Sequence, residues 1–188
     1  MLRRGLGRIL LASVPALVLA GNAAGDQVFL QLDGIEGEAT AVRYAKQIEI
    51  VSWSWGVSNP TTARAARAGG PASGRASVSE LQLMKATDAA TPKLFQNAAS
   101  GKHITKGVLI VQRENDAGGY PYLRITLEDV VVTALQLSAG GDRPTESVSL
   151  GFTRVVIEYR STDASGKPTN WIPAGWDLAT NVSYTPPQ

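Results

Sequence analysis

Two tryptophans two residues apart, in the segment of residues 48–58 (IEIVSWSWGVS), constrain the fold of this chain more than any other feature. Side chains of a β-strand alternate between its two faces. An extended segment therefore places Trp53 and Trp55 on one face, together with Val51 and Val57. Tryptophan and valine favour strands and bury large apolar surfaces. The pattern predicts a central strand with both tryptophans in the core; the alternative is a surface aromatic platform for a sugar or a base.

Further segments with the alternating pattern of strands recur along the chain. They cover residues 27–32, 78–86, 107–113, 120–137, 145–160 and 170–184. Glu128 and Asp129 interrupt the longest segment, as a β-bulge or a corner would. In the last segment, Trp176 is expected to anchor the core. The chain of 188 residues can build one sizeable core and shows no internal repeat, so we expect a single mainly β domain over residues 26–188.

One segment, residues 91–99, has the signals of an α-helix. Thr91 can cap its start, Pro92 suits its first turn, and Gly101 suits its end. The apolar residues of this segment fall on one stripe, which we expect to face the core: Leu94, Phe95 and Ala98. The sequence therefore predicts one helix that packs on the β domain and contributes Leu94 and Phe95 to its core.

A long polar segment, residues 59–77, lies between two predicted strands. It is rich in Ala, Gly, Ser, Thr and Pro, and it carries Arg64, Arg67 and Arg75 without any acidic residue. Such a segment cannot build a core face, and long loops inside compact domains are usually functional or disordered. A basic loop for nucleic acid is one reading, but three arginines without an aromatic residue are a weak signal for it.

The first 25 residues resemble a secretory signal peptide. Three arginines in the first eight residues precede a 12-residue apolar run, and small residues follow, so cleavage near Ala23 or Ala24 is expected. The run is too short to span a bilayer. The alternative is a short N-terminal extension that is amphipathic or disordered. Without these three arginines the chain has 15 basic and 16 acidic residues, which argues against nucleic-acid binding through phosphate contacts.

The sequence lacks the motifs of catalysis, metal binding and cofactor binding. It has no cysteine, which excludes disulfides, thiolate zinc sites and cysteine nucleophiles. His103, the only histidine, is expected to be structural or at the surface, and no G-x-S-x-G elbow, P-loop or dinucleotide-binding glycine motif occurs. We therefore expect a protein that works by binding or assembling, without a cofactor. A hydrolase that uses paired carboxylates is the remaining enzyme class.

Several stretches, taken in order, resemble the haemolysin-coregulated proteins (Hcp) of bacterial type VI secretion systems. They are the turn at Gly37 and Glu38 after the first strand and residues 48–58, 78–103, 122–132, 142–159 and 174–183. Their order and spacing together make the match specific, and it covers more than four-fifths of the chain.

The resemblance implies a compact β-barrel of two antiparallel sheets with one flanking helix. It also implies a structural tube subunit: six copies close a ring, rings stack into a hollow tube, and the lumen can carry effectors. A spike would cap this tube, and a contractile sheath would fire it. In this family the loop after the tryptophan strand meets the next ring, which would make Arg64, Arg67 and Arg75 stacking residues.

The N-terminal segment departs from this family, whose members assemble in the cytoplasm and leave through the secretion apparatus. A working signal peptide in residues 1–25 would send this chain to the periplasm instead. The alternative function is then an exported periplasmic or extracellular module for binding or adhesion, with the same barrel. Either route predicts a secreted protein.

Overall fold

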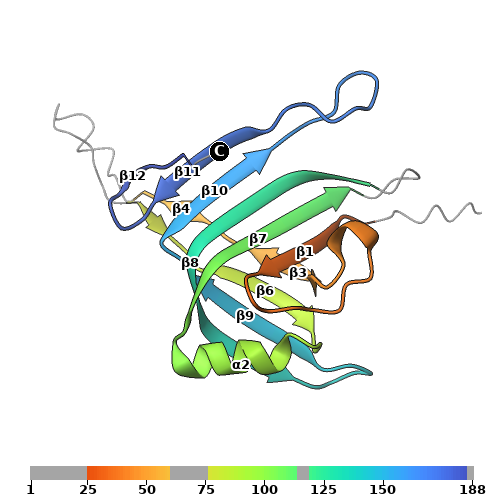
Figure 1. Ribbon diagram of the computed structural model, residues 1–188, viewed down its shortest axis with the longest axis vertical. Coiled ribbons are helices and arrows are strands. Elements are labelled where there is room, and N and C mark those ends of the chain that lie inside the picture. Colours follow the sequence, from red (N-terminus) through yellow and green to blue (C-terminus); the bar gives the residue numbers. More distant parts are fainter. Residues whose placement is uncertain (1–24, 60–75, 114–118, 186–188) are drawn as a thin grey trace, which may run out of the picture.

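The computed structural model of the protein describes residues 25–59, 76–113 and 119–185 (Figure 1). Its helical elements are the 3-10 helix η1 (Val42–Tyr44) and the α-helix α2 (Thr91–Ser100). Its strands are β1 (Gln27–Leu32), β2 (Ile48–Ile50), β3 (Ser52–Ser54), β4 (Val57–Ser58), β5 (Ser77–Val78), β6 (Leu81–Ala86), β7 (His103–Arg113), β8 (Tyr120–Ser138), β9 (Thr145–Gly151), β10 (Arg154–Tyr159), β11 (Ile172–Asp177) and β12 (Val182–Ser183). The prediction of a mainly β protein is confirmed.

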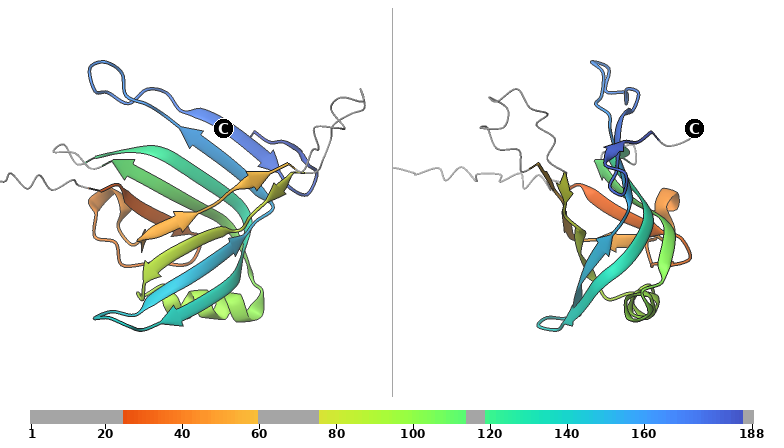
Figure 2. Two further views of the ribbon diagram at one scale, coloured as in Figure 1. Left: turned by 180° about the vertical axis from the view of Figure 1, so that it is seen from behind. Right: turned by 90° about the vertical axis from the view of Figure 1, so that its left-hand side faces the viewer.

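Ten of these strands form one antiparallel sheet that curls around the long strand β8 (Figures 1 and 2). One branch runs in the order β12-β11-β10-β8-β7-β1-β2, and a second branch continues from β8 through β9 and β6 to β3. β8 has 19 residues, so it can hold β10 beside its first half and β9 beside its second half. Asp129, between these halves, has a φ of 55°, a left-handed conformation that aspartate tolerates better than most residues. The predicted corner at Glu128 and Asp129 is confirmed.

The segment with the two tryptophans joins the two branches. β2 pairs with β1, whereas β3, which follows it directly, pairs with β6. Val51 and Ser52, at the change of partner, are both exposed, so the alternation of side chains shifts by one residue there. The isoleucines of β2 are buried before this shift, and Trp53 and Trp55 pack against the core after it.

The prediction of one long strand with Val51 on the tryptophan face is therefore wrong, whereas Val57 stays on the side of Trp55 and lines the same pocket. The segment contains three short strands, and both valines are exposed. The physical reason is the change of partner strand, because a shift of one residue moves the following side chains to the other face.

The expected antiparallel β fold of two sheets with one flanking helix is confirmed, but the sheets do not close into a barrel. The ten strands belong to a single sheet, and the second sheet is only the β4–β5 pair. β8 continues from one branch into the other, so the two branches share this strand. The strands β10, β11 and β12, which we call the arm, extend beyond the curl and end in an open edge at β12 (Figures 1 and 2). The result is a compact β fold that is not a closed barrel.

The helix α2 lies at the end of the molecule opposite the arm, against β8 (Figure 1). Its predicted extent is confirmed to within one residue, with Pro92 in the first turn and Gly101 at the end with a φ of 64°. Its start differs from the prediction, because Ala90 occupies the capping position and makes no side-chain cap. The hydroxyl of Thr91 instead donates to the carboxylate of Glu146 on β9.

Leu94 and Phe95, adjacent on α2, have opposite environments. Leu94 is only 1% exposed and belongs to the core, whereas Phe95 is 63% exposed. The prediction that Phe95 packs in the core is therefore wrong. Successive residues of an α-helix are about 100° apart around its axis, so only one of this pair can face the sheet directly.

The core lies inside the curl of the sheet. It combines aliphatic side chains from both branches and from α2, which include Leu30, Ile48, Leu81, Leu83, Leu94, Leu109, Ile125, Leu127 and Leu150. Trp53, Trp55 and Trp176 pack against this cluster and remain partly exposed. Their contacts agree with the structural role expected from the sequence and place them at the margin of the core.

Replacing Leu94 by Ala should lower the free energy of unfolding by about 2–5 kcal/mol, because it removes a buried side chain and leaves a cavity. Phe95→Ala is the matched control on the same helix and should change the stability of the single subunit by less than about 1 kcal/mol. Urea denaturation followed by circular dichroism measures both. Equal losses for the two variants would show that α2 does not pack through Leu94.

Candidate functional site

The candidate functional sites of this protein are the outer surfaces of its sheet. Within residues 25–59, 76–113 and 119–185, no group of three or more His, Asp or Glu side chains could hold a metal ion. Among the same residues no helix is long and apolar enough to cross a membrane. His103 is exposed, as expected for a surface residue, and its Nδ1 lies 2.6 Å from Oδ1 of Asp129 at the bend of β8.

The outer face of the second branch is built from uncharged side chains. The pairing register places eleven residues in three cross-strand rows: Ser52–Met84–Ser147–Gln136, Ser54–Gln82–Ser149–Ala134 and Ala86–Thr145–Ser138. Buried residues alternate with them on β6 and β9, so these eleven side chains point away from the core. None of the eleven is charged, and we call them the uncharged face.

Hydroxyl and amide groups dominate the uncharged face and bond to one another. Ser149 Oγ donates to Gln82 Oε1 at 2.8 Å, and Thr133, which lies beside the eleven residues, donates its hydroxyl to the backbone carbonyl of Ser149 at 3.1 Å. Ser54 and Gln136 are exposed to solvent. Such a surface can form neutral hydrogen bonds with a passing polypeptide, each of modest net energy, and it offers no ion pairs.

The outer face of the first branch carries alternating charges instead. One cross-strand row reads Lys106–Glu128–Arg154–Asp177 across β7, β8, β10 and β11. Arg154 joins its two acidic neighbours, because its Nε donates to Asp177 Oδ2 at 2.8 Å and its Nη1 lies 3.4 Å from Glu128 Oε2. Opposite charges that face each other across strands stabilise a sheet. We call this row the charge ladder.

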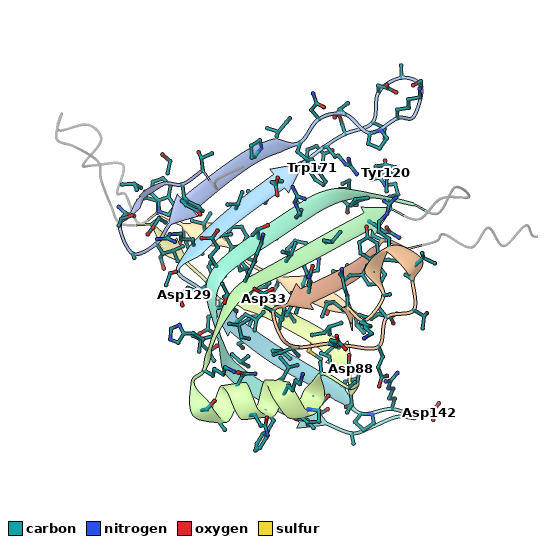
Figure 3. The ribbon with its side chains drawn as sticks, viewed as in Figure 1. Asp33, Asp88, Tyr120, Asp129, Asp142 and Trp171 are labelled. Carbon is teal, nitrogen blue, oxygen red and sulfur yellow. The ribbon has the colours of Figure 1, made fainter. Side chains whose placement is uncertain are left out.

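A second set of ion pairs lies nearer the tip of the arm. Arg124 and Glu158 form a bidentate ion pair between β8 and β10. The ring of Trp171, labelled in Figure 3, lies 4.9 Å from the guanidinium of Arg124 and 4.4 Å from that of Arg160. The charges on this face are thus largely paired, so it does not resemble the unpaired basic surface that binds a nucleic-acid backbone.

Two ionisable groups of this branch have strongly shifted pKa values. The hydrogen bond from Arg154, followed by the backbone N–H of Thr180, lowers the pKa of Asp177 to about 2. Burial raises the pKa of Tyr122 to about 12, and the 2.6 Å hydrogen bond from its hydroxyl to Asp26 adds to this shift. Asp177 therefore stays ionised and Tyr122 stays neutral at physiological pH.

A buried ionic network fixes the start of α2 to the sheet. Lys85 Nζ lies 2.9 Å from Glu146 Oε2 and 2.8 Å from Asp88 Oδ1, and the side chains of Lys85 and Glu146 are 1% and 0% exposed. Glu146 also accepts the hydroxyl of Thr91, and Asp88, labelled in Figure 3, accepts the backbone N–H of Ala90. Removing one partner of such a buried pair typically costs about 3–5 kcal/mol, since it leaves an unpaired buried charge.

Only the base of the long loop is described. β4 and β5 pair as a short ribbon, with Val57 opposite Val78, and the backbone N–H of Ser79 donates to the carbonyl of Gly56. The predicted stacking residues Arg64, Arg67 and Arg75 lie outside the described residues. The predicted signal peptide also lies outside them, except for Gly25. The structure therefore tests neither prediction.

Sequence reasoning missed both the uncharged face and the buried network. An uncharged residue, often serine or glutamine, at every second position of β3, β6 and β9 was an available signal for the uncharged face. No comparable signal marks the network, because Lys85 and Glu146 are 61 residues apart and only the β6–β9 pairing brings them together.

Comparison with known proteins shows to which family this chain belongs. The family described as "Type VI secretion system effector, Hcp" matches residues 29–159, which is more than half of the chain. Protein hcp1 of Pseudomonas aeruginosa is 32% identical over 158 residues, which span 82% of this chain and 96% of that relative. This chain belongs to the Hcp family.

Solved Hcp structures share the fold. A structure described as a type six secretion system protein has a TM-score of 0.78 at 28% identity and covers 85% of this chain and 100% of its own. Hcp1 from Salmonella typhimurium has a TM-score of 0.69 at 31% identity and covers 85% of this chain and 99% of its own. The Hcp resemblance and the assignment to type VI secretion, both made from the sequence, are confirmed.

Asp177 should make the stability of this Hcp protein depend on pH in the acidic range. Its pKa is about 2 in the folded state, against an ordinary value of 3.8, so ionised Asp177 stabilises the fold above about pH 4. This contribution is lost as the pH falls from about 4 to about 2. Asp177→Asn should therefore have a lower melting temperature than the wild type near neutral pH. At about pH 2 the two proteins should melt at the same temperature. A constant deficit in thermal melts across this range would contradict the assignment.

Proposed function

We propose that this Hcp protein is a structural tube subunit of a type VI secretion system, in which six copies close a ring and rings stack into a hollow tube. The observation that carries the proposal is the contrast between the uncharged face and the charge ladder. A tube wall needs one surface toward its channel and a different one toward its surroundings. In this fold the core separates two outer faces, and their chemistry differs in the way that these two roles require.

The uncharged face is assigned to the channel. An effector that travels in the channel must be held and then released, and ion pairs with the wall would oppose release. Neutral hydroxyl and amide groups give many weak contacts that exchange readily. The charge ladder is then assigned to the outside of the tube, where the sheath would lie, and the spike would cap the stack.

Stacking of rings is assigned to the long loop with Arg64, Arg67 and Arg75. The β4–β5 ribbon supports this assignment, because it brings the two ends of the loop side by side at the edge of the fold. Arginines in such a loop can donate charge-assisted hydrogen bonds to acceptors on the next ring. A head-to-tail contact of this kind propagates into an open tube.

The protein is proposed to act by assembly, without catalysis and without a cofactor, and to reach the outside of the cell through the secretion apparatus. The apolar run that follows the three N-terminal arginines favours a second candidate, a module for binding or adhesion that is exported through the periplasm. The N-terminus of the mature protein distinguishes these routes. Retention of residues 1–25 in cytoplasmic rings supports the tube, and a mature chain that starts near Gly25 in a periplasmic extract supports the exported module.

Purified residues 26–188 should form hexameric rings in native mass spectrometry and rings or short tubes in electron micrographs. A chain that stays monomeric at the highest soluble concentration would contradict the proposed function.

A variant of the long loop between β4 and β5 tests the assignment of ring stacking to this loop, with the wild-type chain as the comparison. Replacing residues 61–74 by a short Gly-Ser linker should keep the rings and weaken their stacking, because the proposal places this loop between successive rings. Unchanged tubes would show that the loop is passive. Loss of the rings would place the loop in the lateral interface instead.

A further inference from the structure

The long loop meets the rest of the fold at one edge of the molecule, which we call the loop edge. The described residues at the two ends of the loop, Asn59 and Ala76, line one pocket with Trp176 of β11 and Asn181 of the turn before β12. The β4–β5 ribbon holds these two ends together. The loop edge therefore lies where β11 ends and β12 begins.

The opposite edge is where β1 and β8 begin and where β7 and β10 end, and we call it the N-terminal edge. The residues that mark it are Gln27, Arg113, Tyr120 and Tyr159. The pairing registers bring these strand ends together, because Gln27 lies opposite Gln112 and Arg113 lies opposite Tyr120. Figure 1 and the left view of Figure 2 show the start of β1 and the β4–β5 ribbon on opposite sides of the molecule, and Figure 3 labels Tyr120 at the N-terminal edge.

The N-terminal edge carries side chains that are typical of protein interfaces. Tyr159 is 50% exposed, and Ile172, which pairs with it at the start of β11, is 69% exposed. The ring of Tyr122 lies beside that of Tyr159, with 6.4 Å between their centroids, and the guanidinium of Arg113 lies 5.2 Å from the Tyr122 ring. Aromatic residues and arginine are enriched where proteins contact one another. This surface is therefore suited to receive another subunit.

Hydrogen bonds fix the start of the described chain at the same edge. The hydroxyl of Tyr122 donates to Oδ2 of Asp26 at 2.6 Å, and Nε2 of Gln112 donates to Oε1 of Gln27 at 3.0 Å. Gly25 and Asp26 are exposed to solvent. The preceding residues must therefore continue from the N-terminal edge. Whatever conformation they adopt, they take up space beside the surface of Tyr122 and its neighbours.

Head-to-tail stacking of rings needs both edges of the subunit. Rings that stack in one direction repeat along the tube, so the surface that a subunit offers to the ring above differs from the surface that it offers to the ring below. The proposed function assigns one of these surfaces to the long loop, and hence to the loop edge. The other surface then belongs to the N-terminal edge, and it must be clear of other chain segments before the next ring can reach it.

We infer that residues 1–25 stop the stacking of rings, because they leave the fold beside the surface that the next ring must reach. A ring that keeps them still has a free loop edge, so it can join one end of a tube but cannot be extended further. A ring of chains that start near Gly25 is open at both edges and can be extended. The ratio of the two forms then sets the length of the tube. This inference rests on the proposed tube function and adds its regulation.

The full-length chain and residues 26–188 give the direct comparison. Both should form hexamers in native mass spectrometry, but only residues 26–188 should form species of two or more rings and tubes in electron micrographs. Mixing the two gives a sharper readout. Full-length rings added to rings of residues 26–188 in equal number should shorten the tubes several-fold, because each added ring can only end a tube.

A matched pair of variants of residues 26–188 tests whether the position of the extra chain decides the result. A Gly-Ser segment of about 25 residues before Asp26 should stop stacking, because a flexible chain of this length reaches about 25–30 Å and cannot lie within a close contact. The same segment after Gln188 should leave the tubes intact, because Thr185, near the C-terminus, lines a hollow on the outer face of the first branch with Thr126 and Val156. This pair keeps the test valid even when the apolar run makes the full-length chain insoluble.

The outcomes separate this inference from the proposed function. If full-length rings stack as well as rings of residues 26–188, the stop is wrong and the tube function stands. Equal loss of stacking with the Gly-Ser segment at either end of the chain would also overturn the stop, because its position would then not matter. If no form of the chain makes rings, both the proposed function and the stop fail.

Discussion

A single bend in β8 determines the arrangement of this molecule. The strand is long enough to pair with β10 before the bend and with β9 after it, and Asp129 supplies the left-handed backbone conformation between them. Because one strand serves both branches, the sheet must curl and enclose the core between its branches. The segment from β2 to β3 reinforces this curl, since it pairs with β1 at its start and with β6 at its end. The two outer faces and the two ends of the subunit follow from this geometry.

Local sequence signals predicted the elements well and predicted side-chain directions less well. Alternation of apolar residues identified most strands, and proline and glycine located α2, because these signals depend on neighbours in the chain. Phe95 and Val51 were misplaced because their directions depend on partners: α2 turns Leu94 instead of Phe95 toward the sheet, and the change of partner strand exposes Val51. The Lys85–Glu146 pair could not be foreseen, since it exists only through the pairing of β6 with β9.

The candidate functional surfaces have the same origin. Each row of the uncharged face and of the charge ladder takes its residues from three or four strands, so the rows exist only in the folded register. Inward positions of these strands are committed to the core, which leaves the outward positions free to serve the assembly. Uncharged residues, mostly serine and glutamine, occupy these positions on one branch, and alternating charges occupy them on the other. In our account, this division of outward positions makes one subunit suitable for both the inside and the outside of a tube wall.

The orientation of the subunit in the ring tests this account most directly. A cryo-electron microscopy reconstruction of rings assembled from residues 26–188, at a resolution that traces the strands, would show which branch faces the channel. The account predicts that Ser54 and Gln82 line the channel and that Arg154 and Asp177 lie on the outer wall. A ring with the charge ladder toward the channel and the uncharged face outside would contradict it.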